Sequence, residues 1–542
     1  MNAVHRLRLL LPALLLAVTA CTQSPTPPRG GAGDDNKPAY GDTLVEGTIG
    51  DASTLIPLLA TDSASFAVAD QVYNNLVKYD KDFKIIGSLA ESFDIAPDGL
   101  AITFHLRKGV KWHDGEPFTA RDVLYTYRVT IDPKTPTAYA EGFKQVKSVV
   151  APDDHTVRVT YGAPYAPALE SWASSYILPA HLLEGKDITK SPLARKPVGT
   201  GPYRFKEWVA GQKIVLESNH DYFEGRPWID RFIYRIIPDT STMYMELKAG
   251  AVDTMGLTPV QYARQTTGTR FTSLFNKYRY PSTSYVYLGY NLRHPLFKDK
   301  RIRQALTAAI DKDELIHGVL FGMGQKAVGP IPPGRWAYNP NVKDIAYDPK
   351  HAAELLAQAG WKEKNSDGIL VKDGKPFSFT ILTNQGNQQR LLTAQIIQQR
   401  LKFVGIDVKI RVVEWAAFLK EFVDKGNFEA VMLGWTTSPD PDMYDVWHSS
   451  KTNPGELNFI GYKNAEVDRL LVEGRSTFDI EKRKKAYFRI QEIMADEQPY
   501  TFLYVPDALP VVSARIRGVK PAPIGIGYNQ IKWYVPKAEQ VY

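Results

Sequence analysis

Hydroxyl and carboxylate side chains follow directly after a tryptophan in the last quarter of the chain. Trp435 precedes Thr436, Thr437, Ser438 and Asp440, with proline on either side of the aspartate. An indole offers a flat apolar surface, hydroxyls donate and accept hydrogen bonds, and a carboxylate attracts a cation. This combination favours a recognition site in which Trp435 packs on a ligand. Taken alone, the tryptophan could equally be a core residue.

The sequence motifs of common enzymes are missing. The chain holds no HExxH, no GxSxG and no glycine-rich loop followed by Lys-Ser or Lys-Thr. The nearest approach to a dinucleotide-binding motif, at Gly322 and Gly324, precedes prolines rather than a helix. We therefore predict a binding protein with no catalytic residue and no cofactor. A secreted hydrolase is the less favoured alternative.

Two groups of side chains could hold a metal ion. His105 and His113 flank a turn, but His105 alternates with apolar residues and the pair lacks the close spacing of zinc ligands. Asp440, Asp442 and Asp445 could offer oxygen ligands to calcium, although carboxylates that cap turns around the two prolines explain the same pattern. We predict no metal site.

The Trp435 segment needs a strand to position it. Residues 430–433 form an apolar run typical of a strand buried on both faces, and Pro439 limits its extent because proline cannot donate to a sheet ladder. Alternating strands and helices give a parallel, right-handed unit, which predicts an α/β fold. Loop 384–387 and the Trp435 segment should then share the sheet edge where ligands bind. The expected strand-helix-strand-helix-strand order covers residues 376–383, 388–403, 406–413, 415–425 and 430–433.

The first residues have the layout of a secretion signal. Arg6 and Arg8 precede an apolar run that is too short to span a bilayer. The run ends at Cys21, the only cysteine, in a setting that resembles the lipobox of bacterial lipoproteins. We predict a signal peptide over residues 1–20, and a lipidated Cys21 followed by a disordered tether over residues 21–42, a stretch rich in Pro, Gly and Ser.

Length and charge limit the remaining possibilities. A chain of 542 residues is too long for one ordinary domain, so two or three are expected. Its 66 basic and 59 acidic residues are interspersed without a basic block, which argues against a nucleic-acid partner. Aromatic residues make up 11% of the chain, a composition that suits a recognition surface as well as a core.

A series of short motifs follows in a fixed order. It comprises SFDIAPDG, TFHLRKGVKWHDGEPFTARDV, VGTGPYRFKEW, NHDYFEGRPWID, MELKAGAVD, KRIRQALTAAIDKDEL, GPIPP, GW before PDPD, and NFIGYKNAEVD. In this order they resemble the peptide/nickel/opine family (family 5) of solute-binding proteins of ABC importers, over nearly all of the chain from Thr43 to Trp533.

The resemblance implies a two-lobed periplasmic-binding-protein fold of type II, with an extra domain inserted in lobe I. The chain would cross between the lobes near residues 285–292 and 505–509. The implied boundaries are lobe I at residues 43–75, 195–285 and 505–542, the extra domain at residues 76–194, and lobe II at residues 286–504.

Members of this family specialised for dipeptides often hold the ligand's ammonium with an aspartate three residues after the loop tryptophan. They hold its carboxylate with an arginine after the first strand of lobe II. Ser438 and Asn384 stand at these positions, so both charged anchors are absent from them. Either Asp440 replaces the first anchor, or the ligand is a longer peptide held through its backbone. The expected binding set is Trp435, Thr436, Thr437, Ser438, Asp440, Asn384, Thr61, Ser63 and Tyr73.

The resemblance thus implies an extracytoplasmic receptor that captures oligopeptides or dipeptides between its lobes and delivers them to the permease and ATPase complex of an ABC importer. An oligosaccharide, an opine or a nickel complex is the alternative cargo. We expect a monomer, held to the membrane by the lipid on Cys21 and facing the periplasm or the outside.

Overall fold

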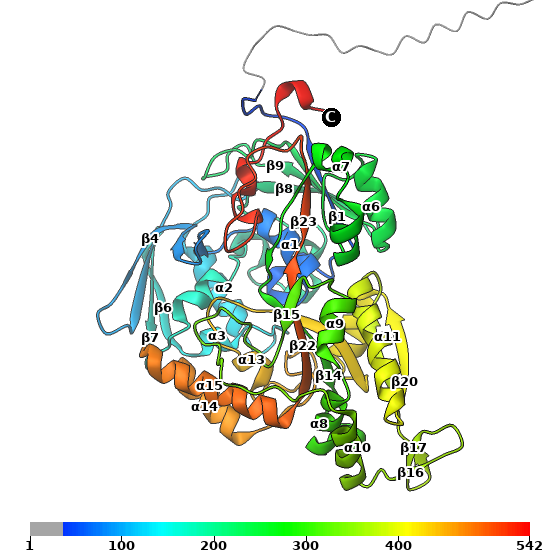
Figure 1. The fold of residues 1–542 in the computed structure, drawn as a ribbon. Helices are drawn as coiled ribbons and strands as arrows, with labels where there is room; N and C mark the ends of the chain where they lie inside the picture. The colour runs from blue at the N-terminus through cyan, green and yellow to red at the C-terminus, as the bar shows by residue number, and fades with distance from the viewer. Residues whose placement is uncertain (1–35) are drawn as a thin grey trace, which may run out of the picture.

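The structure of the chain, a computed structural model, describes residues 36–542. The predicted signal peptide, the lipidation of Cys21 and most of the predicted tether lie outside the described residues. The described part forms three bodies around the three largest sheets (Figure 1). We call these bodies lobe I, the extra domain and lobe II. They lie at the top, at the left and at the bottom of Figure 1.

Lobe I is built on a seven-stranded sheet that collects strands from both ends of the chain, in the order β12-β23-β11-β1-β10-β9-β8. Along β1, Leu44 packs into one core cluster and Val45 into another, because successive side chains of a strand point to opposite faces. Lobe I comprises β1 (Thr43–Thr48), α1 (Ser63–Val72), β8 (Tyr203–Val209), β9 (Lys213–Ser218), β10 (Arg231–Ile236), α6 (Thr240–Lys248), β11 (Thr254–Gly256), α7 (Thr269–Leu274), β12 (Phe275–Lys277) and β23 (Pro510–Ser513).

The extra domain holds an antiparallel sheet in the order β4-β5-β7-β6. Helix α2 packs on it and begins with a capping box between Thr119 and Asp122. The domain comprises β2 (Val77–Tyr79), β3 (Ile85–Gly87), β4 (Ala90–Ile95), β5 (Ala101–Leu106), α2 (Ala120–Ile131), α3 (Glu141–Lys144), β6 (Val146–Asp153), β7 (Thr156–Tyr161), α4 (Ala168–Ala173) and α5 (Ala180–Leu183).

Lobe II contains a sheet in the order β13-β22-β14-β21-β19-β20, with β15 also paired to β22. Its strands are β13 (Tyr280–Pro281), β14 (Ser284–Tyr290), β15 (Gly324–Lys326), β19 (Ser378–Asn384), β20 (Asp407–Val413), β21 (Ala430–Thr436) and β22 (Tyr500–Ala508). A small separate sheet holds β16 (Glu363–Lys364), β17 (Leu370–Lys372) and β18 (Lys375–Pro376).

The helices of lobe II cover both faces of its sheet (Figure 1). They are α8 (Lys300–Ala308), α9 (Lys312–Gly318), α10 (Pro349–Gln358), α11 (Gln388–Phe403), α12 (Trp415–Ala417), α13 (Tyr444–Trp447), α14 (Ala465–Arg475) and α15 (Ile480–Glu497).

The predicted parallel unit of lobe II is confirmed. Strand β19 pairs in parallel with both β20 and β21, and α11 has the predicted bounds. The second predicted helix differs, because α12 is a single turn that passes into a π-helical turn at Phe418–Val423.

Strand β21 is longer than the apolar run that predicts it. It continues to Thr436, and its antiparallel partner β14 sets Tyr285 opposite Trp435. One residue further on, the Thr437 amide still donates to the Thr283 carbonyl. The apolar pattern ends early because the last residues of the strand line a cavity and are only partly buried or exposed, while their backbone groups remain paired. Trp435 therefore belongs to a strand and not to a loop.

The chain crosses between the lobes at two neighbouring places. Strand β22 in the sheet of lobe II runs through Leu509 directly into β23 in the sheet of lobe I. The earlier crossing lies between β12 and β14 at residues 278–283, which include the short edge strand β13. The family resemblance implies a crossing near residues 285–292, but most of these residues form the buried strand β14 in the middle of the lobe II sheet.

Arg515 ties distant parts of lobe I together. Its guanidinium binds the carboxylate of Asp253 at 2.8 Å through two nitrogens, pairs with Asp42 and donates to the Thr43 carbonyl at 2.8 Å. Both carboxylates are buried, at 5% exposure for Asp42 and 3% for Asp253. The arginine thus joins the start of β1 to the last tenth of the chain.

We expect Arg515→Ala to lower the free energy of unfolding by about 3–5 kcal/mol, because it leaves two buried carboxylates without a counter-charge. The control is Arg517→Ala, since Arg517 pairs with Glu539 where both side chains are about one-third exposed. Loss of such a surface pair costs about 0–1 kcal/mol. Urea unfolding of both variants measures the difference, and equal effects would contradict the assigned role of Arg515.

Candidate functional site

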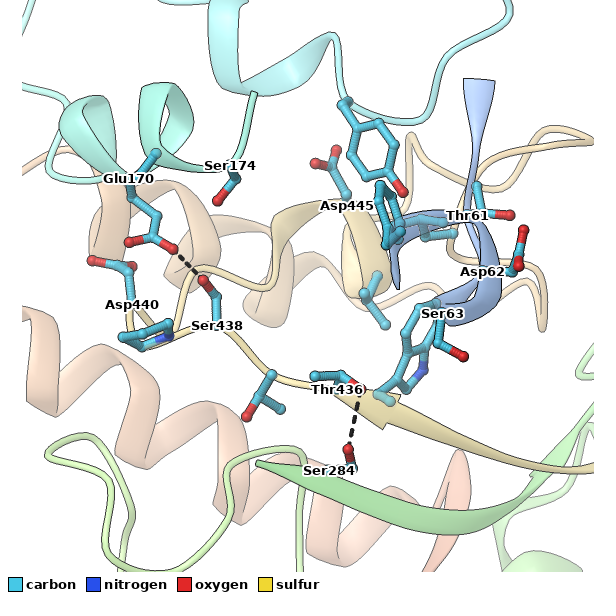
Figure 2. Close-up of a pocket in the computed structure, with 18 of the residues that line it drawn as sticks. Thr61, Asp62, Ser63, Glu170, Ser174, Ser284, Thr436, Ser438, Asp440 and Asp445 are labelled. Atoms are coloured by element: carbon cyan, nitrogen blue, oxygen red, sulfur yellow. Dashed lines mark hydrogen bonds between the residues drawn. The ribbon is translucent and has the colours of Figure 1, made fainter. Parts of the chain in front are cut away.

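A cavity of about 1280 Å³ lies between the three bodies. Lobe I contributes the start of α1, the extra domain contributes α4, and lobe II contributes β14, β21 and the start of α11. We call this cavity the cleft, and Figure 2 shows part of it. Its volume exceeds the roughly 300–1,000 Å³ of small-molecule pockets, so it can take a ligand of several residues.

Trp435 lies at the cleft end of β21, with its side chain partly buried. Its indole nitrogen donates to the Tyr500 hydroxyl at 3.4 Å, and its ring centroid lies 5.9 Å from that of Phe459. These contacts fix the ring on one side and leave part of it facing the cleft. The position fits the predicted role of a surface on which a ligand packs.

The two threonines after Trp435 differ in how many of their hydrogen-bonding groups are already used within the protein. Thr436 is exposed, and its hydroxyl lies 3.1 Å from that of Ser284 (Figure 2). Thr437 donates through both its amide and its hydroxyl to the Thr283 carbonyl, at 2.9 and 2.7 Å. Its donors are therefore already used within the protein, and Thr436 is the better candidate for contact with a ligand.

Asp440 lines the cleft, but its charge has a partner in the protein. A nitrogen of Arg483 lies 2.8 Å from each carboxylate oxygen, and the amide of Asp442 donates to the same group at 2.9 Å. The predicted role of Asp440 as a free charge for the ligand's ammonium is corrected accordingly. Asp440 caps a turn and balances a buried arginine.

The other predicted contacts divide between cleft and core. Thr61 and Ser63, at the start of α1, are exposed and line the cleft (Figure 2). Tyr73 is 2% exposed in the core of lobe I and does not line the cleft, so its predicted contact with the ligand is corrected. It closes the end of α1, where the chain turns inward. Asn384 is buried and lines a smaller side cavity.

Ser438 and Asn384, which stand at the two anchor positions without a charge of their own, each contact a charged side chain from another part of the chain. The hydroxyl of Ser438 donates to the carboxylate of Glu170, which comes from α4 of the extra domain (Figure 2). A nitrogen of Arg390, in the first turn of α11, donates to the Asn384 side-chain oxygen at 2.9 Å. A carboxylate thus contacts Ser438 and a guanidinium contacts Asn384. Proximity of Arg390 to loop 384–387 was visible in the sequence, whereas nothing there links Glu170 to Ser438.

Neither Glu170 nor Arg390 has an ion-pair partner within the described residues. Glu170 forms no ion pair there, and burial raises its pKa to about 7. The Nε of Arg390 is buried without a hydrogen-bond partner in the same range, and burial lowers the pKa of its guanidinium. Both groups line the cleft. A ligand that carries a cation and an anion would supply the counter-charges that these side chains lack.

The side chains that could have bound a metal are engaged otherwise. Asp442 pairs with Arg475 at 2.6 Å and Asp445 with Lys451 at 3.4 Å, which accounts for two of the possible calcium ligands. His105 contacts Asp94, while His113 contacts the Gly201 carbonyl. Within residues 36–542, no group of three or more His, Cys, Asp or Glu side chains is placed to hold a metal ion.

Comparison with known proteins identifies the family. Residues 84–456 match the family described as "Bacterial extracellular solute-binding proteins, family 5 Middle". Oligopeptide-binding protein AppA of Bacillus subtilis (strain 168) is 39% identical over 538 residues, which cover 97% of this chain and 98% of AppA. The chain belongs to family 5 of the bacterial extracellular solute-binding proteins. This confirms the predicted resemblance and the prediction of a binding protein instead of an enzyme.

Solved structures match the fold. AppA from Bacillus subtilis in complex with a nonapeptide has a TM-score of 0.88 and 38% identity, and the match covers 92% of this chain and 100% of AppA. NikZ from Campylobacter jejuni in complex with Ni(L-His) has a TM-score of 0.83 and 29% identity, covering 91% and 99%. DppA from Helicobacter pylori in complex with peptide STSA has a TM-score of 0.82 and 32% identity, covering 92% and 99%. The predicted α/β fold class is confirmed.

We expect Trp435→Ala to weaken binding of a mixed-peptide pool about thirtyfold or more, since loss of an aromatic anchor costs about 2 kcal/mol or more. The melting temperature of the unliganded protein should stay within a few degrees. The matched control is Trp447→Ala, because Trp447 is 0% exposed and packs on Tyr462 and Tyr500. That substitution should cost about 3–5 kcal/mol of stability. Calorimetric titration and thermal unfolding separate the two roles, and a collapse in stability for Trp435→Ala would make its ring structural.

Proposed function

We propose that this protein captures oligopeptides in its cleft and delivers them to the permease and ATPase complex of an ABC importer. The observation that carries the proposal is that Glu170 of the extra domain and Arg390 of lobe II, side chains of opposite charge type that have no ion-pair partner within the described residues, both line the cleft. A peptide with free ends offers an ammonium for the first and a carboxylate for the second. The peptide complexes of AppA and DppA support the same class of ligand.

The remaining contacts suit the backbone of a peptide. Thr61, Ser63 and Thr436 present exposed hydroxyls to the cleft, which can pair with main-chain amides and carbonyls of any sequence. Trp435 offers an apolar surface between them. Such a site binds many peptides, because hydrogen bonds to the backbone are independent of the side chains. Its ligand specificity then depends on the termini and on local side-chain pockets.

We expect Glu170→Gln to weaken binding of the free tetrapeptide Ser-Thr-Ser-Ala about tenfold or more, and to leave its N-acetylated form almost unaffected. Arg390→Gln should give the mirror result with the free and the C-amidated peptide. Acetylation and amidation each remove the charge that the side chain would face. Isothermal titration calorimetry of the three peptide forms measures both effects.

Asp440→Asn is the matched control, because its carboxylate is already bound by Arg483. This substitution should lower thermal stability without changing the ratio of affinities for free and acetylated peptide. If no peptide form binds the wild-type protein, the proposed function is refuted. If free and blocked peptides lose affinity equally in Glu170→Gln, the function stands while the assignment of the ammonium anchor fails.

We also propose that the protein is a lipoprotein held to the outer face of a membrane through Cys21. The support is the sequence before that cysteine, together with a tether-like stretch after it. Between residues 36 and 542, no helix is both long and apolar enough to cross a bilayer.

Cys21→Ser should release the protein from the membrane fraction, because it removes the thiol that carries the lipid. Fractionation of cells and mass spectrometry of the mature N-terminus test this. A wild-type protein that is recovered in the supernatant, with an N-terminus other than a modified Cys21, would refute the anchor.

A further inference from the structure

A second cavity, of about 190 Å³, opens beside the cleft between lobe I and lobe II. Glu46, Tyr234 and Arg390 line both cavities, so the smaller one is reached from the larger. Ala64 and Ala67 of α1 lie on its wall and leave the space open by their small size. The volume is below the roughly 300 Å³ at which small-molecule pockets begin, which suits one side chain of a ligand.

The carboxylate of Glu46 is the distinctive group of this side cavity. Glu46 lies in β1, opposite Tyr234 of β10 and Thr254 of β11, and shares its face of the strand with the core residue Leu44. Its side chain is partly buried, where ionised groups usually have a partner. Among residues 36–542, however, the carboxylate of Glu46 forms no hydrogen bond and no ion pair.

The guanidinium of Arg390 also lines this cavity, but it does not pair with Glu46. Arg390 comes from lobe II and directs a nitrogen to Asn384, and no ion pair joins it to Glu46. The other carboxylate on the wall, Asp51, is held by the Trp208 indole nitrogen and the Gly211 amide. Opposite charges that line one cavity from different lobes, without touching, leave room for a ligand group between them.

The electrostatics favour a cation in that place. Burial raises the pKa of Glu46 to about 7, so its surroundings in the protein disfavour the ionised carboxylate. A neutral or acidic side chain would leave that penalty in place, whereas an ammonium or guanidinium would remove it. The cleft as a whole is also acidic, because ten carboxylate residues and four basic residues line it within the described part of the chain.

We propose that the side cavity is a specificity subsite for a lysine or arginine side chain of the bound peptide, with Glu46 as the counter-ion. Because Arg390 lines the same cavity, the basic residue sits close to the peptide's carboxyl end. The subsite rests on the proposed function, since it requires a peptide in the cleft. The receptor, which otherwise binds the peptide backbone, would then prefer peptides that carry a basic side chain.

The test uses variants of the tetrapeptide Ser-Thr-Ser-Ala in which each position in turn carries lysine, norleucine or glutamate. Norleucine is the matched control for lysine, because it keeps the aliphatic chain and lacks the charge. At one position near the carboxyl end, lysine should bind about tenfold or more tighter than norleucine to the wild-type protein. Calorimetry also reports whether glutamate at that position binds weakest.

Glu46→Gln should abolish the preference for lysine and leave the affinity for the norleucine peptide unchanged, which also shows that the variant folds. Glu217→Gln is the control within the same sheet, since Glu217 is 40% exposed and faces Lys206 at 3.5 Å. It should keep the preference. Acetylated peptides should keep it too, because the cation is a side chain.

Two results would overturn the subsite while the proposed function stands. One is binding of the series with no preference for lysine over norleucine at any position, or with a preference that survives Glu46→Gln. The other is an effect of Glu46→Gln that disappears when the peptides are acetylated, because the cavity would then hold the amino terminus. If the wild-type protein binds no member of the series, the proposed function itself fails.

Discussion

An ionised side chain removed from water destabilises a protein unless a counter-charge or several hydrogen bonds replace the lost solvent. This constraint governs the cleft. Asp440 and Asp442 meet it through Arg483 and Arg475, and these pairs fix the turn that follows Trp435. Glu46, Glu170 and Arg390 do not meet it from within the described chain. The cleft therefore combines a charge-balanced wall with three charged side chains that have no ion-pair partner within the described residues.

The elements of lobe II follow from local sequence patterns, whereas the end of strand β21 does not. Helix α11 could be predicted to the residue, because a polar N-cap at Asn387 precedes it and Gly405, which adopts a positive φ, follows it. Strand β21 extends beyond its apolar run because β14, more than a hundred residues earlier, pairs with its last residues. Pairing between strands so far apart in the chain leaves no hydrophobic periodicity in the local sequence. The first crossing was misplaced for the same reason, since β14 is a core strand whose partners are remote.

For the site, the sequence indicated which segments line the cleft better than it indicated how the charged side chains pair. The apolar run that ends at Trp435 predicted the edge of the sheet, and family resemblance placed Thr61 and Ser63 near it. Tyr73 was assigned to the same set, yet it packs inward because α1 ends there against the core. The partners of Ser438 and Asn384 decide the electrostatics of the cleft. Glu170 could not be inferred for Ser438, because the two residues lie far apart in the chain and meet only through the arrangement of the extra domain and lobe II.

The same arrangement explains how binding can favour a closed form. The extra domain and lobe II contact each other directly, since Glu141 pairs with Lys451 at 3.0 Å and the Ala166 amide donates to the Arg475 carbonyl at 2.8 Å. A ligand shifts a conformational equilibrium only by its difference in affinity for the two states. Glu170 belongs to the extra domain and Arg390 to lobe II. Under the proposed function, a peptide bound to both side chains favours the arrangement of the two bodies in which their separation matches that of its charged ends.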